Sequence, residues 1–184
     1  MNREQQAEFL RVRQIAIRRL RQVKLKSSRL ASHICKYVEL PSFGNAIAWD
    51  VLSMLTREGK SLRLFRTCWR YDQDSEAFRS PIIRLKHPKP YLPTLESGWV
   101  ELRSSELHGI LELLTGTRVP MYCDNHHVGF DGTSFELTMG DAFCFTTIHW
   151  WSRLPKEWLP LESAVKKLIR MFEEAWDSKM KTGQ

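Results

Sequence analysis

A chain of 184 residues, of which 42% are hydrophobic and 27% charged, has the size and composition of one globular domain that folds without disulfides or metals. No apolar run approaches the roughly 20 residues that cross a bilayer, and the N-terminus lacks the apolar core of a secretion signal, so we expect a cytoplasmic protein. The net charge of +7 comes entirely from residues 1–30, because the rest of the chain holds equal numbers of acidic and basic side chains.

Residues 3–26 predict a long amphipathic helix with a basic surface. They contain neither Pro nor Gly, and apolar residues recur from Phe9 to Val23 at steps of three and four, which gives one apolar stripe. Glutamates stand early in this stretch and lysines late, as the helix dipole favours. We therefore divide the chain into a basic amphipathic helical segment, residues 1–28, and a single α+β domain, residues 29–184.

Residues 27–97 contain both helical and strand patterns. Residues 27–45 show no clear period, whereas the stretch from about Asn45 to Gly59 has four apolar residues at helical spacing and predicts a helix with a glycine cap. Residues 61–71 alternate and predict a strand that ends at the polar run 72–75. Three prolines in residues 86–97 predict an extended loop.

The second half predicts a sheet closed by a helix. A short strand at 98–103 is followed by a helix that begins at Ser104 and stops at Gly116. Asp131-Gly132, between two strand-like runs, predicts a type I′ turn with positive φ at both positions. Residues 142–151 predict the next strand, and residues 160–176 a helix in which Pro160 stands in the first turn.

These elements together predict an α+β fold. Its antiparallel sheet includes a meander near residues 118–151 and is packed by helices, with the long basic helix in front.

A thiol and several histidines lie close together in residues 121–137. A zinc site needs three or four convergent ligands, and neighbouring residues of a strand point to opposite faces. Cys123, His127 and His149 are the only combination that fits, against the alternative of exposed loop histidines and a buried thiol. No motif marks an activated nucleophile, and no Gly-rich phosphate loop is present. We assign no catalytic residue, no metal and no cofactor.

Tryptophans gather around the last strand and the closing helix. Trp150 and Trp151 face opposite ways in a strand, so one of them can be internal and the other external. Trp151 either packs against Trp158 and the nearby prolines or anchors a protein interface, where Trp is enriched. Trp151 and Trp158 are therefore the candidate partner-binding residues.

The basic helix allows four interpretations. Its charged face is simply solvated, contacts nucleic-acid phosphates, docks to an acidic protein or to a second copy, or lies on an anionic membrane. No helix-turn-helix, zinc-finger or RNA-binding signature accompanies it. The candidate nucleic-acid contacts are Arg11, Arg13, Arg18, Arg19, Arg21, Lys24 and Lys26.

The C-terminal third to half of the chain combines a D-G-T-x-aromatic hairpin, an aromatic strand ending near W-W, a P-x-x-W turn and a closing amphipathic helix. The residues that carry these features are Asp131, Gly132, Thr133, Phe135, Trp150, Trp151, Pro155 and Trp158. In these features the chain resembles small uncharacterised bacterial α+β proteins. The resemblance implies a bacterial α+β domain and no particular activity.

We interpret the sequence as that of a non-catalytic cytoplasmic protein that presents a sheet-and-helix surface to another macromolecule. The partner is another protein with an acidic surface, or a second copy of the chain. An immunity, defence or mobile-element accessory role suits a small bacterial protein of this kind. The alternatives are nucleic-acid binding through the basic helix and a metal-dependent hydrolase around Cys123, His127 and His149.

Overall fold

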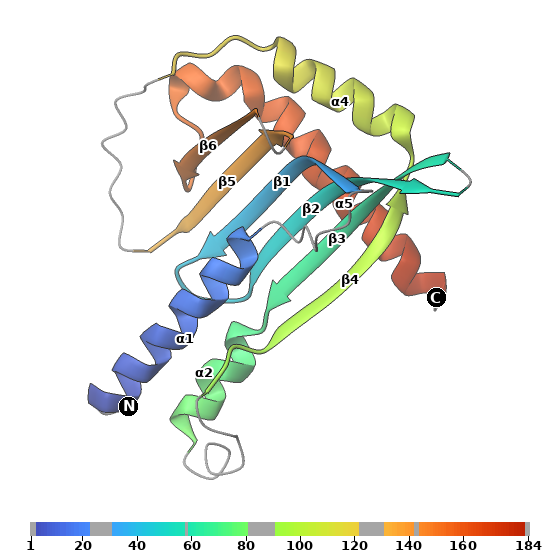
Figure 1. Cartoon of the computed structure of the whole chain (residues 1–184). Coiled ribbons are helices and arrows are strands. Elements are labelled where there is room, and N and C mark those ends of the chain that lie inside the picture. The colour runs from blue at the N-terminus through green and yellow to red at the C-terminus, as the bar shows by residue number, and fades with distance from the viewer. Residues whose placement is uncertain are drawn as a thin grey trace.

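The computed structural model describes residues 3–22, 31–57, 59–80, 91–121, 131–141 and 144–182. A six-stranded antiparallel sheet has the order β4-β3-β2-β1-β5-β6, so the first strand of the chain lies inside the sheet (Figure 1). This confirms the α+β class with an antiparallel sheet packed by helices. The strands are β1 (Ala31–Pro41), β2 (Ala46–Thr56), β3 (Gly59–Trp69), β4 (Leu95–Leu102), β5 (Thr133–Gly140) and β6 (Phe145–Trp151).

The larger core lies on one face of the sheet, under α4 (Ser104–Gly116), the 3₁₀ helix η1 (Lys156–Leu161) and α5 (Glu162–Thr182). The two helices predicted in this half of the chain are confirmed, although Pro160 stands in η1 and not in α5. Leu168 and Phe172 of α5 are fully buried, and α5 crosses behind the sheet in Figure 1. None of the helices in the described ranges has the length and apolar character needed to span a membrane.

The opposite face is covered by α1 (Arg3–Arg21) and α2 (Tyr71–Arg79), which enclose a second core (Figure 1). Val12, Ala16 and Leu20 of the predicted apolar stripe have no exposed surface, which confirms that α1 is amphipathic and packs on the sheet. Residues 23–30, with the end of the predicted helix, lie outside the described residues.

Polar contacts also hold α1 against the body of the protein. The Lys36 ammonium on β1 donates to the Gln22 carbonyl at 3.1 Å and to the buried Asp50 carboxylate at 2.8 Å. Arg11 donates to the Tyr91 carbonyl at 2.9 Å, and Arg21 is bound to Glu136 of β5. The buried Lys36 ammonium needs several acceptors to offset its lost hydration, and the Gln22 carbonyl and the Asp50 carboxylate supply them. The C-terminal end of α1 is therefore fixed over β1 and β5.

The helix predicted from about Asn45 to Gly59 is wrong, because these residues form β2 and the start of β3. Strand β2 lies between β1 and β3 and is covered on both faces. Ile47, Trp49 and Val51 point toward α5, whereas Ala48 points toward α1. A strand buried on both sides has no polar face, so its apolar residues also satisfy a helical period.

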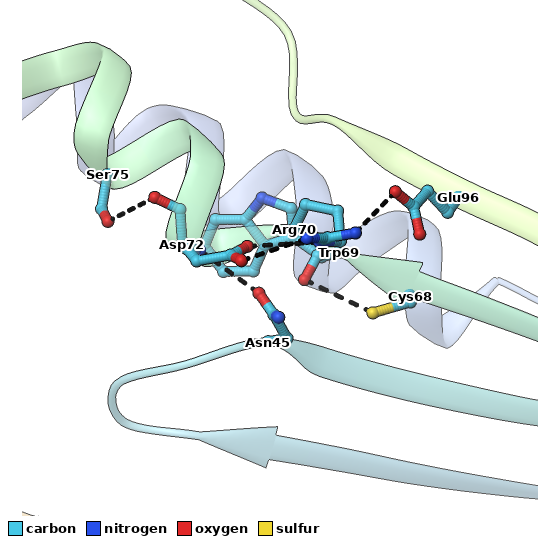
Figure 2. A network of polar contacts seen from close by, with 7 residues as sticks. All are labelled: Asn45, Cys68, Trp69, Arg70, Asp72, Ser75 and Glu96. Carbon is cyan, nitrogen blue, oxygen red and sulfur yellow. Dashed lines mark hydrogen bonds and ion pairs between the residues drawn. The ribbon is translucent and has the colours of Figure 1, made fainter.

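Strand β3 ends before the polar run 72–75 as predicted, but this run lies in the first turns of helix α2, which was not predicted. Figure 2 shows the contacts at this junction. Arg70 is bound to Asp72 at 3.2 Å and to Glu96 of β4 at 2.8 Å, and Asn45 accepts the Asp72 backbone N–H at 3.2 Å. The network links the β1–β2 turn, β3, α2 and β4. The predicted loop 86–97 holds for residues 91–94, after which β4 begins, whereas 81–90 lie outside the described residues.

The predicted type I′ turn at Asp131-Gly132 is also wrong. Among the described residues, positive φ angles occur at Ser152, Gly44, Gly59 and Gly140, and at neither of these two positions. Gly132 is instead a point of close approach, since an added Cβ would lie 2.5 Å from Ser152 Oγ and 2.8 Å from the Trp151 ring. Residues 122–130, which hold the strand expected before the turn, lie outside the described part of the chain.

Candidate binding groove

A groove of about 910 Å³ opens between the sheet and the segment that joins β6 to α5. Aromatic side chains form its floor, aliphatic side chains its wall, and charged side chains its rim. The residues that line it are Tyr37, Phe135, Trp150, Ser152, Arg153, Leu154, Pro155, Lys156, Glu157, Leu159, Glu162, Val165, Lys166 and Ile169.

The floor is built by three adjacent strands. Phe135 of β5 and Trp150 of β6 are direct cross-strand partners, with stacked rings whose centroids are 5.3 Å apart. Tyr37 of β1 stacks on Phe135 at 6.2 Å. The three side chains share one face of the sheet because each strand alternates its side chains between the two faces. These ring distances lie in the range that aromatic pairs prefer, and the arrangement is present without a ligand, so the floor is preformed.

The wall is held in place by a short irregular segment. Ser152 has φ of 57° directly after β6, and this left-handed residue turns the chain away from the sheet. In η1, the Trp158 indole donates to the Pro120 carbonyl at 2.9 Å, and Leu161 is buried in the main core. Exposed Leu159 is thereby presented at the groove.

Charged side chains of both signs, Glu157 among them, stand at the η1 end of the groove. Arg153 and Lys156 are exposed at the η1 end, and Lys166 is paired there with Glu162 at 2.8 Å. Glu173, one turn along α5 from Ile169, is exposed and is not among the residues that line the groove.

Half-buried Glu39 is the cross-strand neighbour of Phe135, next to the floor of the groove. Burial, and then the charge of Glu173, raise the pKa of the Glu39 carboxyl. Burial together with the same two carboxylates also raises the pKa of Tyr37. The Tyr37 hydroxyl therefore lies within the electrostatic influence of both glutamates.

The predicted partner-binding residues lie around this groove and not in it. Trp158 is 9% exposed and supports the wall from inside. Trp151 is half-buried on the opposite face from Trp150, against Gly132. Partner binding by Trp151 and Trp158 stays a prediction.

The predicted nucleic-acid contacts divide into three groups. Arg18 and Arg19 are exposed on α1, and among the described residues no ion pair involves them. Arg11 and Arg21 contact the body through Tyr91 and Glu136, and Arg13 is half-buried. Lys24 and Lys26 lie outside the described residues.

The described residues contain no group of three side chains that could hold a metal. Of the candidate ligands, Cys123 and His127 lie outside the described part of the chain, whereas exposed His149 is 3.7 Å from Glu136. Cys35 is fully buried, and burial, with a contribution from Asp50, raises the pKa of its thiol to about 12. A thiol in this state is inert at neutral pH.

Comparison of the chain with protein-family models, with curated proteins and with solved structures gives no match. The resemblance of the C-terminal part to small bacterial proteins therefore stays a prediction.

Proposed function

We propose that this protein is a non-catalytic binding protein that holds an extended segment of a partner protein in the groove between the sheet and α5. The observation that carries the proposal is the preformed aromatic floor of Tyr37, Phe135 and Trp150 under a groove of about 910 Å³. Binding sites typically combine such a volume with apolar lining and a few charged groups that set orientation. A preformed floor also lowers the entropy cost of binding.

Leu159 offers a test that leaves the core intact. It is 48% exposed at the groove, and Leu113 of α4 is 49% exposed outside it, so the two leucines make a matched pair. We expect Leu159→Arg to weaken capture of a partner from an extract of the source cells at least tenfold, and Leu113→Arg to leave it unchanged. Quantitative mass spectrometry identifies the partner, and calorimetry with the purified partner then repeats the comparison. Equal capture by both variants would refute the proposal.

Nucleic-acid binding through α1 is a second candidate, favoured by the exposure of Arg18 and Arg19. Contacts of this kind act on phosphates, so they are insensitive to sequence and weaken steeply with salt. We expect a variant with Arg18→Glu and Arg19→Glu to lose binding to a labelled 20-nucleotide single strand and to a labelled 20-base-pair duplex. Fluorescence anisotropy measures both affinities. Exposed Lys167 and Arg170 on α5 supply the control pair, both changed to Glu. Equal affinity of the two double variants for these nucleic acids would exclude nucleic-acid binding through α1.

A cytoplasmic location, a bacterial source and a role in immunity, defence or mobile elements stay predictions.

A further inference from the structure

Two basic side chains stand at the η1 end of the groove without an acidic partner in the described part of the protein. Arg153 and Lys156 both line the groove, and both are exposed. Neither side chain makes an ion pair or a hydrogen bond with any described residue. Lys166, the third basic residue of the lining, differs because it is paired with Glu162 at 2.8 Å. Arg153 and Lys156 are thus the cations of the groove that a ligand can engage.

The end of β6 brings these cations to the aromatic floor. Arg153 follows Trp150 of the floor by only three residues, and left-handed Ser152 turns the chain between them. The Arg153 backbone N–H donates to the Trp151 carbonyl at 2.6 Å, which orders the backbone directly after this turn. Lys156 follows as the first residue of η1. The two charges are therefore carried by the same segment that forms one end of the groove.

The carboxylates around the groove leave this end with a surplus of positive charge. The lining holds three basic and two acidic side chains, and one of the acids, Glu162, is the partner of Lys166. The other acid, Glu157, is exposed and makes no ion pair with a described residue. Glu39 stands next to the floor on β1, two strands away from β6. An anionic group of a ligand is therefore favoured at Arg153 and disfavoured beside Glu39.

We propose that the groove selects a partner segment in which an apolar side chain is followed by an acidic one. The apolar side chain lies on Phe135 and Trp150, and the carboxylate contacts Arg153 and Lys156. Residues i and i+2 of an extended segment point to the same side, so the two side chains are two positions apart. This inference rests on the proposed function, because it names the kind of segment that the groove holds.

The chemistry of the two basic side chains favours a carboxylate. The Arg153 guanidinium can donate two parallel hydrogen bonds to one carboxylate, and the Lys156 ammonium adds a second positive charge. Both groups are exposed, so the two contacts together should change the affinity by about fivefold and not by orders of magnitude. A cationic segment would be repelled, and an uncharged one would gain only the apolar contacts with the floor. The charge therefore supplies selectivity among apolar segments.

Two peptides and three proteins test this. The peptides are acetyl-Leu-Ser-Phe-Ser-Glu-Ser-amide and the same peptide with Gln in place of Glu, which differ by one charge. The proteins are the wild type, a variant with Arg153→Gln and Lys156→Gln, and a control with Lys167→Gln and Arg170→Gln. The control removes the same two residue types from exposed positions of α5 that do not line the groove. NMR shifts of the floor side chains follow binding.

We expect the Glu peptide to bind the wild type and the control about fivefold more tightly than the Gln peptide at low ionic strength. In roughly 0.5 M salt this ratio should fall toward one, because the charges are exposed and screened. In the variant with Arg153→Gln and Lys156→Gln the ratio should be about one at both salt concentrations. This variant should bind the Gln peptide as tightly as the wild type does, because its aromatic floor is unchanged.

Three results would overturn the inference: equal affinities of the two peptides for the wild type, the same ratio in the variant as in the wild type, or no shift of the floor side chains with either peptide. Equal binding of both peptides on the floor would leave the proposed function standing. The Leu159→Arg comparison decides that function without either peptide.

Discussion

At the scale of single residues, buried Asp74 is the strongest polar anchor of α2. Its carboxylate accepts the Trp69 indole N–H at 2.7 Å, the Thr94 backbone N–H at 3.0 Å and the Thr94 hydroxyl at 2.7 Å. We expect Asp74→Ala to lower the free energy of unfolding by about 3 kcal/mol, because three donors lose their acceptor. Asp72→Ala, two residues away and half exposed, should change it by at most about 1 kcal/mol. Urea unfolding measures both, and equal losses would contradict this account.

Glu39 makes stability depend on pH. Its pKa in the folded protein is raised above the usual 4.5 by burial and by Glu173, so the neutral form is the one that folding favours. The contribution of this group is fully present below pH 4.5 and is lost as the pH rises through the raised pKa. We therefore expect Glu39→Gln to raise the melting temperature at pH 7 and to lose this advantage as the pH falls toward 4.5. A difference in melting temperature that stays constant across this pH range would show that folding does not disfavour the charged form of the Glu39 carboxyl.

At the scale of elements, α1 is a structural part of the sheet's second core. Leu20 has no exposed surface, whereas Leu10 on the same helix is 54% exposed. We expect Leu20→Ala to lower the free energy of unfolding by about 3 kcal/mol, through lost burial and a cavity. Leu10→Ala should change it by less than about 0.5 kcal/mol. Chemical unfolding of the two variants is the measurement, and a small effect at Leu20 would mean that α1 is a separable appendage.

Strand β4 and α5 meet at a glycine. A Cβ at Gly98 would lie 2.7 Å from the Trp176 ring, which also packs on Trp49 and faces the Arg66 guanidinium. We expect Gly98→Ala to lower the free energy of unfolding by about 1–2 kcal/mol, because the ring must move.

Gly109 is the control for this substitution. It stands inside α4, where an added Cβ meets nothing within 4 Å. Gly109→Ala should therefore be stabilising, by about 0.7 kcal/mol, since alanine has the higher helix propensity. Opposite signs in the two variants are the expected result of unfolding measurements, and a stabilised Gly98→Ala would refute the contact.

The sequence was sufficient for elements with one buried face. Helix α1 has a narrow apolar stripe, and α4 has a clear start and stop, so both helices can be recognised in the sequence. Strand β2 was misassigned because α1 and α5 cover both of its faces and remove the alternation. Helix α2 was missed although a signal existed, since acidic residues in a first turn before Ala77 and Phe78 are typical of a helix start.

The groove could not have been predicted in the same way. Phe135 and Trp150 stood out in the sequence, but Tyr37 came from a stretch without a clear period. Only the insertion of the β5–β6 hairpin beside β1 brings Tyr37 against them. Long-range pairing of this kind leaves no local pattern in the chain.

At the scale of the whole molecule, the two edge strands of the sheet differ in how far they are covered. The Lys179 ammonium of α5 donates to the Trp99 carbonyl at 2.8 Å and covers part of edge strand β4. Strand β6 is the other edge of the described sheet, and Phe145 on it is 64% exposed. An edge strand with exposed apolar residues and no lysine favours pairing with another strand.

We therefore expect the protein to associate through β6 as its concentration rises. Thr146→Lys should suppress this association, because a charge on the edge opposes strand pairing. Ser105→Lys, at an exposed position on α4, is the control for added charge. Sedimentation velocity over a concentration series is the measurement, and equal association of both variants would place the contact elsewhere.

The Arg21–Glu136 contact joins residues 115 positions apart, and this has a consequence for synthesis on the ribosome. Translation at about 5–20 residues per second separates the two partners by roughly 6 to 23 s. The apolar residues of the body that pack with the stripe of α1 all lie between Val38 and Leu95, so they are already made before that interval is over. Helix α1 can therefore pack on β1–β3 well before β5 is made, and the contact with Glu136 then fixes its C-terminal end at a later stage of synthesis.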